Sequence, residues 1–294
     1  MKNRTLSVNL FSERPTRQSS ASQQAGRYTG ALPVKGESMG MLEDRFNLSG
    51  QVAVVTGAGR GIGEGIATDF AKAGARVVLA ARRTAEIETV AARIRDNGGQ
   101  AVAVTTDVTD DAAVDRLAQR TVEEFGKLTV WVNNAGGSPL RMPVSELPRA
   151  EWDRTIALNL TAIYVGSITA ARYMERGSII NITSGAGSGP VPGSAHYGAA
   201  KAGTNSLTWT LSAEFAPLIR VNAVAPGAIP TEVMLKAIDK DTSQLDEVLE
   251  EWNIPLGRLG TPEDIASACI YLASDAASWV SGEILRVGGG AKPR

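Results

Sequence analysis

The sequence predicts a doubly wound α/β domain, in which a parallel sheet carries helices on both faces. Two observations lead to this prediction. From Gln51 onward, short β-branched runs alternate with longer stretches of helical period, which is typical of βαβ units with right-handed crossovers. A glycine-rich turn also follows the first of these runs directly. In open α/β sheets, such a turn lies at the carboxyl end of a strand, where ligands bind.

Length and composition agree with one folded enzyme-sized domain. The chain has 294 residues, is 43% hydrophobic, and balances 30 Lys and Arg against 31 Asp and Glu. Without a charge excess, we expect a small-molecule partner and neither nucleic acid nor a membrane. Cys269 is the single cysteine and His196 the single histidine. These counts exclude an internal disulfide, favour a reducing, cytoplasmic location, and predict no metal site.

The first 45 residues differ from the rest in composition. Residues 1–36 contain six basic residues and one acidic residue, with clustered Ser, Gln and Gly, which is typical of disorder. We expect residues 1–45 to be a disordered extension before a single domain over 46–294. An Arg- and Ser-rich segment that is poor in acids is also typical of an organelle transit peptide. The other interpretation, which we favour, is an extension without function, because Met39 and Met41 precede the first well-patterned segment.

Seven β-branched runs are candidate strands. Strands that are buried on both faces of a parallel sheet read as continuous apolar runs. The runs cover residues 51–56, 75–80, 100–106, 129–134, 177–183, 219–225 and 282–287.

Helix starts can be placed at two further points. The sequence TPED offers Thr261 as an N-cap and Pro262 at the first helical position, so a helix should begin near Pro262. A second helix begins at TDDAAV, where Thr109 is better placed than Asp107 to act as the cap. Residues 228–256 carry Pro and charge without strand signals, and we expect a helical, mobile flap there.

The glycine turn lies in TGAGRGIG. The G-x-G-x-x-G spacing does not occur, because Ile62, Glu64 or Ile66 stands where the third glycine would be. The cluster alone is compatible with a tight structural turn or with a phosphate-binding turn that leads into a helix N-terminus. The spacing T-G-x-x-x-G-x-G is the more informative feature.

Further motifs follow this turn in a fixed order. They are Asp107-Val108, Asn133 to Gly136, Asn159, Ser184, Tyr197 with Lys201, and Pro226-Gly227 with Thr231. In this combination the chain resembles the short-chain dehydrogenase/reductase family over about residues 48–290. The resemblance implies a seven-stranded Rossmann fold with strand order 3-2-1-4-5-6-7, a nicotinamide cofactor across the carboxyl edge of the sheet, and a homotetramer. Residues 258–290 and PGAIPT have a modest resemblance to the bacterial hydroxysteroid dehydrogenase branch.

The end of the second strand indicates which cofactor is used. Ala81 stands where NAD binders carry an acid that accepts the ribose 2′-hydroxyl. Arg82 and Arg83 follow, and Arg60 lies in the glycine turn. Because guanidinium groups match phosphate oxygens, we expect NADP(H) to be preferred, with NAD(H) as the alternative. Arg82 or Arg83 can instead be a solvated charge at a helix start.

The resemblance implies a larger set of cofactor contacts. Asp107 is expected at the adenine with Val108 packed beside it, and the run from Asn133 is expected near the adenosine ribose. The full expected set is Gly57, Arg60, Gly61, Ile62, Gly63, Arg82, Asp107, Val108, Asn133, Ala135, Gly136, Tyr197, Lys201, Pro226, Gly227, Ile229 and Thr231.

The reacting group is expected at Tyr197. Lys201 stands four positions later, so both share one helix face, and the ammonium should lower the pKa of the phenol. Tyr197 would then donate a proton to a carbonyl oxygen or accept one from an alcohol. The resemblance adds Ser184 as a hydrogen-bond donor to the same oxygen, and Asn159 as part of a helix distortion that holds a water near Lys201. His196 is interpreted as pocket wall or helix start.

The substrate is expected to be a ketone or a secondary alcohol, and the hydroxysteroid resemblance suggests a bulky, apolar one. A second candidate is 3-oxoacyl-[acyl-carrier-protein] reductase. In such enzymes arginines dock the carrier, but Val165 and Ala213 stand at the corresponding positions. The non-enzyme alternative is a dinucleotide-binding sensor or scaffold, which would not need Ser184, Tyr197 and Lys201.

Overall fold

The computed structural model describes residues 43–138 and 140–291, all of which lie within one compact unit, Met39–Arg294. Residues 43–46 form a helical turn, after which the Asn47 N–H donates to the carbonyl of Glu43 over 3.0 Å. Of the expected extension over 1–45, only residues 43–45 fall within the described ranges. The remainder of that prediction, residues 1–42, lies outside the described residues.

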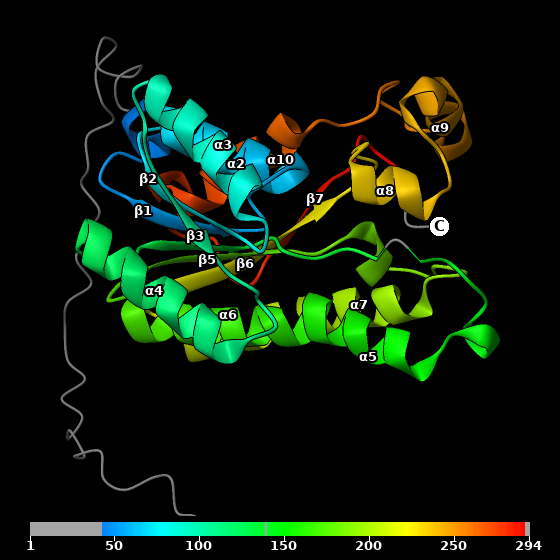
Figure 1. The fold of residues 1–294 in the computed structure, drawn as a ribbon, viewed down its shortest axis with the longest axis horizontal. Coiled ribbons are helices and arrows are strands. Elements are labelled where there is room, and N and C mark those ends of the chain that lie inside the picture. Colours follow the sequence, from blue (N-terminus) through cyan, green and yellow to red (C-terminus); the bar gives the residue numbers. More distant parts are fainter. Residues whose placement is uncertain (1–42, 139, 292–294) are drawn as a thin grey trace, which may run out of the picture. The chain divides into compact units, whose positions relative to one another are not determined.

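A seven-stranded sheet forms the centre of the described fold (Figure 1). All of its pairings are parallel and its order is β3-β2-β1-β4-β5-β6-β7, as the family resemblance implied. Every expected strand is present, and the expected doubly wound topology is confirmed. The strands are β1 (Val52–Thr56), β2 (Arg76–Ala81), β3 (Gln100–Thr105), β4 (Val130–Asn133), β5 (Gly177–Ile182), β6 (Ile219–Pro226) and β7 (Ile284–Val287).

Both faces of the sheet are covered, which explains why its strands lack polar alternation. In β1, Ala53 and Val55 belong to one apolar cluster, whereas Val54 between them belongs to the other. All three side chains are fully buried. A residue that points to either face of such a strand is removed from water, so β-branched runs are favoured along its whole length.

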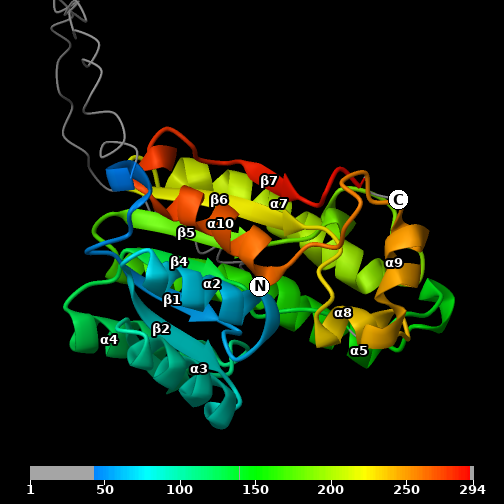
Figure 2. The ribbon, with the colours of Figure 1, turned by 90° about the horizontal axis from the view of Figure 1, so that it is seen from above.

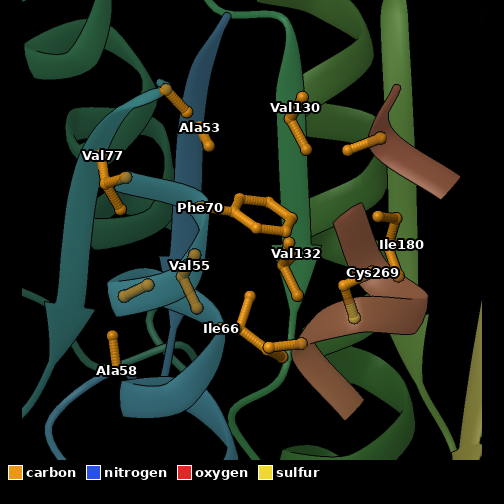
Figure 3. Close-up of a cluster of buried hydrophobic side chains, with 14 of the residues drawn as sticks. Ala53, Val55, Ala58, Ile66, Phe70, Val77, Val130, Val132, Ile180 and Cys269 are labelled. Atoms are coloured by element: carbon orange, nitrogen blue, oxygen red, sulfur yellow. The ribbon is translucent and has the colours of Figure 1, made fainter. Parts of the chain in front are cut away.

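One layer consists of α2 (Gly61–Lys72), α3 (Thr84–Asp96) and α10 (Pro262–Ala273). Ile66 and Phe70 of α2 and Cys269 of α10 lie over the sheet in one apolar cluster (Figure 3). Burial raises the pKa of the Cys269 thiol, which lies in the apolar core as its sequence context predicted. Thr261 caps α10 and Asp264 completes the capping box, so the predicted start at Pro262 is confirmed.

The other layer consists of α4 (Asp111–Phe125), α6 (Ala162–Tyr173) and α7 (Ala195–Glu214). The predicted cap of the helix after the third strand is wrong. Asp110, and not Thr109, accepts hydrogen bonds from the first turn of α4. Thr109 is already engaged, because its N–H and its hydroxyl both donate to Oδ1 of Asp107.

The remaining elements lie in the connections. They are η1 (Val144–Glu146), α5 (Arg149–Ile156), the π-helical turn η2 (Ala157–Thr161), η3 (Gly185–Gly187), α8 (Glu232–Ala237), η4 (Thr242–Gln244), α9 (Leu245–Trp252) and η5 (Asp275–Ala277). Figure 2 shows α8 and α9 beyond the arrowheads of the strands, and thus at the carboxyl edge of the sheet. The segment expected as a flap is therefore helical.

The second half of the flap is tied together by ion pairs. Lys240 Nζ lies 2.9 Å from Glu247 and 2.7 Å from Glu251, and only 14% of the Lys240 side chain is exposed. Within the described part of the chain, no helix is both long and apolar enough to cross a membrane.

Candidate active site

The glycine turn joins β1 to α2 in a conformation that needs glycine. Gly57 and Gly61 have φ values of +67° and +59°. At Gly63, a Cβ atom would lie 2.3 Å from the carbonyl oxygen of Gly57 and 2.4 Å from Nδ2 of Asn134. No described side chain caps the first turn of α2, so its N–H groups face the turn and favour an anion there.

Thr56 and Asn134 hold this turn against the end of β4. Oγ1 of Thr56 accepts hydrogen bonds from the N–H groups of Asn134 and Ala135, each over 3.0 Å. Asn134 Nδ2 in turn donates to the carbonyl of Thr56 over 2.8 Å. Neither is a predicted site residue, although Thr56 belongs to TGAGRGIG and Asn134 to the run from Asn133 to Gly136. Their role is to fix Ala135 beside the glycine turn.

The side chain of Asn133 lies in the core. Its Oδ1 accepts from Trp131 Nε1 over 2.7 Å, and its Nδ2 donates to Asn181 Oδ1 over 2.9 Å and to Ser167 Oγ over 3.0 Å. Asn133 is 4% exposed. Because these partners use both the acceptor and the donors of the amide, Asn133 fixes β4 and leaves no side-chain group for a ligand.

Arg82 and Asp107 lie at the ends of β2 and β3. Oδ1 of Asp107 accepts from Thr109 N over 2.9 Å and from Thr109 Oγ1 over 2.7 Å. The Thr109 backbone hydrogen bond is the main reason why the pKa of Asp107 is lowered, and the charge of Arg82 adds to this effect. Arg82 is exposed, and Val108 is buried beside Asp107.

The other two arginines are paired with acids. Arg83 forms an ion pair with Glu86 of α3, and Arg60 forms one with Glu232 of α8. Among the three arginines predicted to attract a phosphate, Arg82 is the one whose charge lowers the pKa of Asp107 at the ends of β2 and β3.

Helix α7 brings Tyr197 and Lys201 to the end of β5. Lys201 Nζ donates to the carbonyl of Ile182 over 2.8 Å and lies 5.6 Å from the ring centre of Tyr197. Ser184 lies two residues after the end of β5, and its Oγ accepts from the N–H of Ala186 over 3.2 Å. The spacing of four residues therefore puts the two side chains on one face, as predicted.

The two pKa values differ from the simple expectation. Burial lowers the pKa of Lys201 from 10.5 to about 8. Burial also raises the pKa of the Tyr197 phenol, and a hydrogen bond with Ser184 acts in the opposite direction. The expected net lowering of the Tyr197 pKa is therefore absent in this structure, because burial outweighs the hydrogen bond with Ser184.

Asn159 lies in the π-helical turn η2 and clamps the loop after β4. Its Oδ1 accepts from Gly137 N over 2.7 Å, and its Nδ2 donates to Gly137 O over 3.1 Å. A Cβ on Gly136 would lie 2.8 Å from Asn159 Oδ1 and 3.5 Å from Lys201 Nζ. Thr204 Oγ1 donates to the carbonyl of Asn159 over 3.1 Å. The expected helix distortion is present, and it packs against α7, the helix that carries Lys201.

The segment that leads into the flap lies on the glycine turn. Gly227 N donates to Val287 O over 2.8 Å, which holds Pro226 and Gly227 at the end of the sheet, and Ile229 is buried. Thr231 caps α8, and its Cγ2 lies 3.1 Å from the position of a Cβ on Gly61. The flap therefore begins in contact with the turn that starts α2.

His196 occupies the second position of α7, which agrees with its interpretation as a residue at a helix start. It is 1% exposed, and its Nε2 lies 2.9 Å from Ser138 Oγ. Burial lowers the pKa of the imidazole, so the neutral form is favoured. Its hydrogen bond joins the start of α7 to the loop after β4.

These residues fit a dinucleotide. The cradle at Gly57 and Gly63 would be filled by a Cβ, the first turn of α2 is open to an anion, and Arg82 is exposed at the end of β2. Ser184, Tyr197 and Lys201 converge where β5 ends and α7 begins. Groups suited to proton transfer therefore lie at the same edge of the sheet as the glycine turn.

Comparison with known proteins gives consistent relatives. A family model described as "Enoyl-(Acyl carrier protein) reductase" matches residues 57–292. The 7alpha-hydroxysteroid dehydrogenase of Escherichia coli K12 is 38% identical over 251 residues, which cover 84% of this chain and 96% of that protein. The 3beta-hydroxysteroid dehydrogenase 1 of Eggerthella lenta is 41% identical over 252 residues, with coverages of 83% and 94%. The 3-oxoacyl-[acyl-carrier-protein] reductase of Synechocystis is 39% identical over 253 residues, with coverages of 83% and 97%.

Solved structures with the same fold include complexes with both nicotinamide cofactors. A 7 alpha-hydroxysteroid dehydrogenase complexed with NADH and 7-oxo glycochenodeoxycholic acid has a TM-score of 0.79 and 36% identity, and the match covers 85% of this chain and 98% of that one. A protein described as an NAD(P)-dependent gluconate 5-dehydrogenase from Beutenbergia cavernae, with bound NADP, has a TM-score of 0.77 and 37% identity, with coverages of 84% and 98%.

Proposed function

Since this chain belongs to the short-chain dehydrogenase/reductase family, we propose that it transfers a hydride between NADP(H) and a bulky, apolar ketone or secondary alcohol. The family makes it an oxidoreductase that acts on hydroxyl or keto groups. The observation that carries the proposal is the convergence of Ser184, Tyr197 and Lys201 at the carboxyl edge of the sheet, where the glycine turn also lies. A protein that only binds a dinucleotide has no use for this set.

Each of the three residues has a separate task in the proposed reaction. The nicotinamide, when bound, supplies or accepts the hydride. The Tyr197 hydroxyl donates a proton to the carbonyl oxygen during reduction and takes it back during oxidation. The Ser184 hydroxyl donates a hydrogen bond to the same oxygen as negative charge develops there. Lys201, with a pKa of about 8, provides the positive charge nearby and binds the nicotinamide ribose.

Asn159 is a positioning residue in this proposal. Its side chain clamps Gly137, and its main-chain carbonyl accepts from Thr204, so the loop after β4 and the start of α7 keep their spacing around Lys201. A water held in the η2 distortion would link Lys201 to solvent and return the proton.

The preference for NADP(H) rests on the end of β2. Ala81 provides no carboxylate to accept a ribose 2′-hydroxyl, and Arg82 is exposed beside Asp107. A guanidinium favours a 2′-phosphate at that point. NAD(H) is the alternative, because one structural relative was solved with NADH and another with NADP.

The apolar substrate class is supported by two relatives named as hydroxysteroid dehydrogenases. The second candidate is 3-oxoacyl-[acyl-carrier-protein] reductase, the name of the Synechocystis relative. Docking of an acidic carrier needs exposed arginines, but Val165 packs against the apolar cluster under α6 and Ala213 carries no charge. This arrangement favours the free ketone over the carrier-bound one.

We also propose a cytoplasmic homotetramer. Trp279 is 98% exposed and Trp209 is 56% exposed. Leu160, Tyr164 and Leu207 also line a groove between η2, α6 and α7, together with Gly203 and three hydroxyl residues. Large apolar side chains on a surface favour burial against a partner, and a second copy of the chain would supply it. Light scattering should give about four times the monomer mass, whereas a monomer would contradict the proposed assembly.

The experiment that tests the function is a substrate panel read by NADPH and NADH oxidation. The panel contains 3-keto and 7-keto steroids, cyclic ketones, and acetoacetyl thioesters with and without a carrier protein. We expect turnover of apolar ketones with a higher kcat/KM for NADPH than for NADH. Preference for the carrier-bound thioester would support the second candidate, and a preference for NADH would contradict the cofactor assignment.

A further inference from the structure

Arg60, the cation of the glycine turn, is held by an acid of the flap. Its guanidinium pairs with the carboxylate of Glu232, the first residue of α8, which lies 172 residues further along the chain. The two side chains are 38% and 69% exposed, so solvent and ligands can reach both. The ion pair therefore joins the start of α2 to the start of the flap across the open edge of the sheet.

A second contact makes the same junction. The Cγ2 atom of Thr231 lies 3.1 Å from the position of a Cβ on Gly61, and Thr231 Oγ1 accepts from Met234 N over 3.3 Å to cap α8. The first turn of α8 is therefore built directly on the glycine turn. Thr231 therefore places the start of α8, and with it the backbone of Glu232, beside the turn that carries Arg60.

A carboxylate and a phosphate make the same kind of contact with a guanidinium. Each offers oxygen acceptors to the planar N–H donors, so the two anions compete for one arginine. Glu232 therefore binds the guanidinium of Arg60 at the point where a phosphate ligand would otherwise bind it. The substitution Glu232→Gln removes the negative charge that competes for Arg60. The neutral amide of glutamine keeps the size of the side chain.

We propose that Glu232 is a specificity-determining residue, which lowers the affinity of the protein for 2′-phosphorylated adenosine ligands by holding Arg60. The proposal rests on the proposed use of NADP(H). Binding of the 2′-phosphate then requires Arg60 to leave Glu232. Ligands that lack the 2′-phosphate leave the ion pair in place.

The test uses 2′,5′-ADP and 5′-ADP as probes, with Kd measured by calorimetry at low ionic strength on the full chain. Exposed ion pairs contribute up to about 1 kcal/mol, so Glu232→Gln should tighten 2′,5′-ADP by about two- to fivefold. The affinity for 5′-ADP should not change. The gain should shrink as salt is added, because the competition is electrostatic.

Two further variants separate competition from loosening of the flap. Glu247→Gln removes a carboxylate from the same flap, but its partner is Lys240 and not Arg60, so it should leave both affinities unchanged. In an Arg60→Gln background, Glu232→Gln should give no gain. An equal gain in Glu247→Gln, a gain that persists without Arg60, or weaker binding in Glu232→Gln would each overturn the proposal.

The same measurements distinguish this proposal from the cofactor assignment. If the wild-type chain binds 5′-ADP as tightly as 2′,5′-ADP, then the preference for NADP(H) is wrong. The role of Glu232 is wrong as well if Glu232→Gln then gives no gain for 2′,5′-ADP. If the wild-type chain prefers 2′,5′-ADP and Arg60→Gln reduces this preference, but Glu232→Gln gives no gain, only the role of Glu232 is wrong.

Discussion

Lys201 is a buried ammonium, and its removal should change how stability depends on pH. The side chain is 3% exposed, and its Nζ donates to the carbonyl of Ile182. Burial lowers its pKa from 10.5 to about 8. The substitution Lys201→Met keeps the length and apolar stem of the side chain while it removes the group that titrates.

The magnitude follows from the difference in proton affinity between the unfolded and the folded chain. The fall in pKa from 10.5 to about 8 corresponds to a cost of about 3 kcal/mol at pH 7, where both states carry the proton. Between pH 8 and 10.5 the folded chain loses the proton before the unfolded chain does. Stability therefore rises with pH in that window, and about 2 kcal/mol of the cost is relieved by pH 9.5.

Urea unfolding of the wild type and of Lys201→Met at pH 7, 8.5 and 9.5 measures this effect. The free energy of unfolding of the variant, minus that of the wild type, should fall by about 2 kcal/mol from pH 7 to pH 9.5. Lys127→Met is the matched control, because Lys127 is exposed, and its difference from the wild type should not vary with pH. A difference for Lys201→Met that is constant to within about 0.3 kcal/mol would refute the reasoning.

Three further substitutions test the supporting structure. Gly63→Ala brings a Cβ to 2.3 Å from the carbonyl oxygen of Gly57. We therefore expect NADPH to bind at least about tenfold more weakly in a fluorescence titration. Unchanged binding would contradict the close approach of the two backbone segments. Asn133→Leu leaves Trp131 Nε1 without its acceptor and Asn181 Oδ1 without its donor in the core, and it should cost about 2–4 kcal/mol in urea unfolding. A cost below about 0.5 kcal/mol would show that the network is dispensable. Thr261→Ala removes the cap of α10 and should lower the free energy of unfolding by about 1 kcal/mol, with no change in KM. A change in KM would mean that this helix end acts on the site.

The sheet could be predicted strand by strand because its signals are local. Runs such as Val52 to Val55 are buried on both faces and so are apolar throughout, and Thr261 with Asp264 forms a cap within four residues. The order of the strands is not a local property. It came from the family resemblance, and no pattern within a strand says which strand lies beside it.

The spacing of Tyr197 and Lys201 predicted their common face, since the distance along a helix is fixed by its geometry. Partners that are remote in sequence could not be predicted. Arg60 meets Glu232 only because the flap folds back, and Asn133 turns into the core to meet Trp131 and Asn181. The direction of the Tyr197 pKa was missed for the same reason, because it depends on burial by surrounding elements.

The most direct test of the central claim is the rate of ketone reduction by Tyr197→Phe under saturating NADPH. This substitution removes the hydroxyl and keeps the ring, so cofactor affinity should stay within about twofold of the wild type. General acid catalysis is worth about 100- to 10,000-fold, and kcat should fall by at least about 100-fold. A Tyr197→Phe variant that reduces the ketone at the wild-type rate would contradict the assignment of Tyr197 as the proton donor.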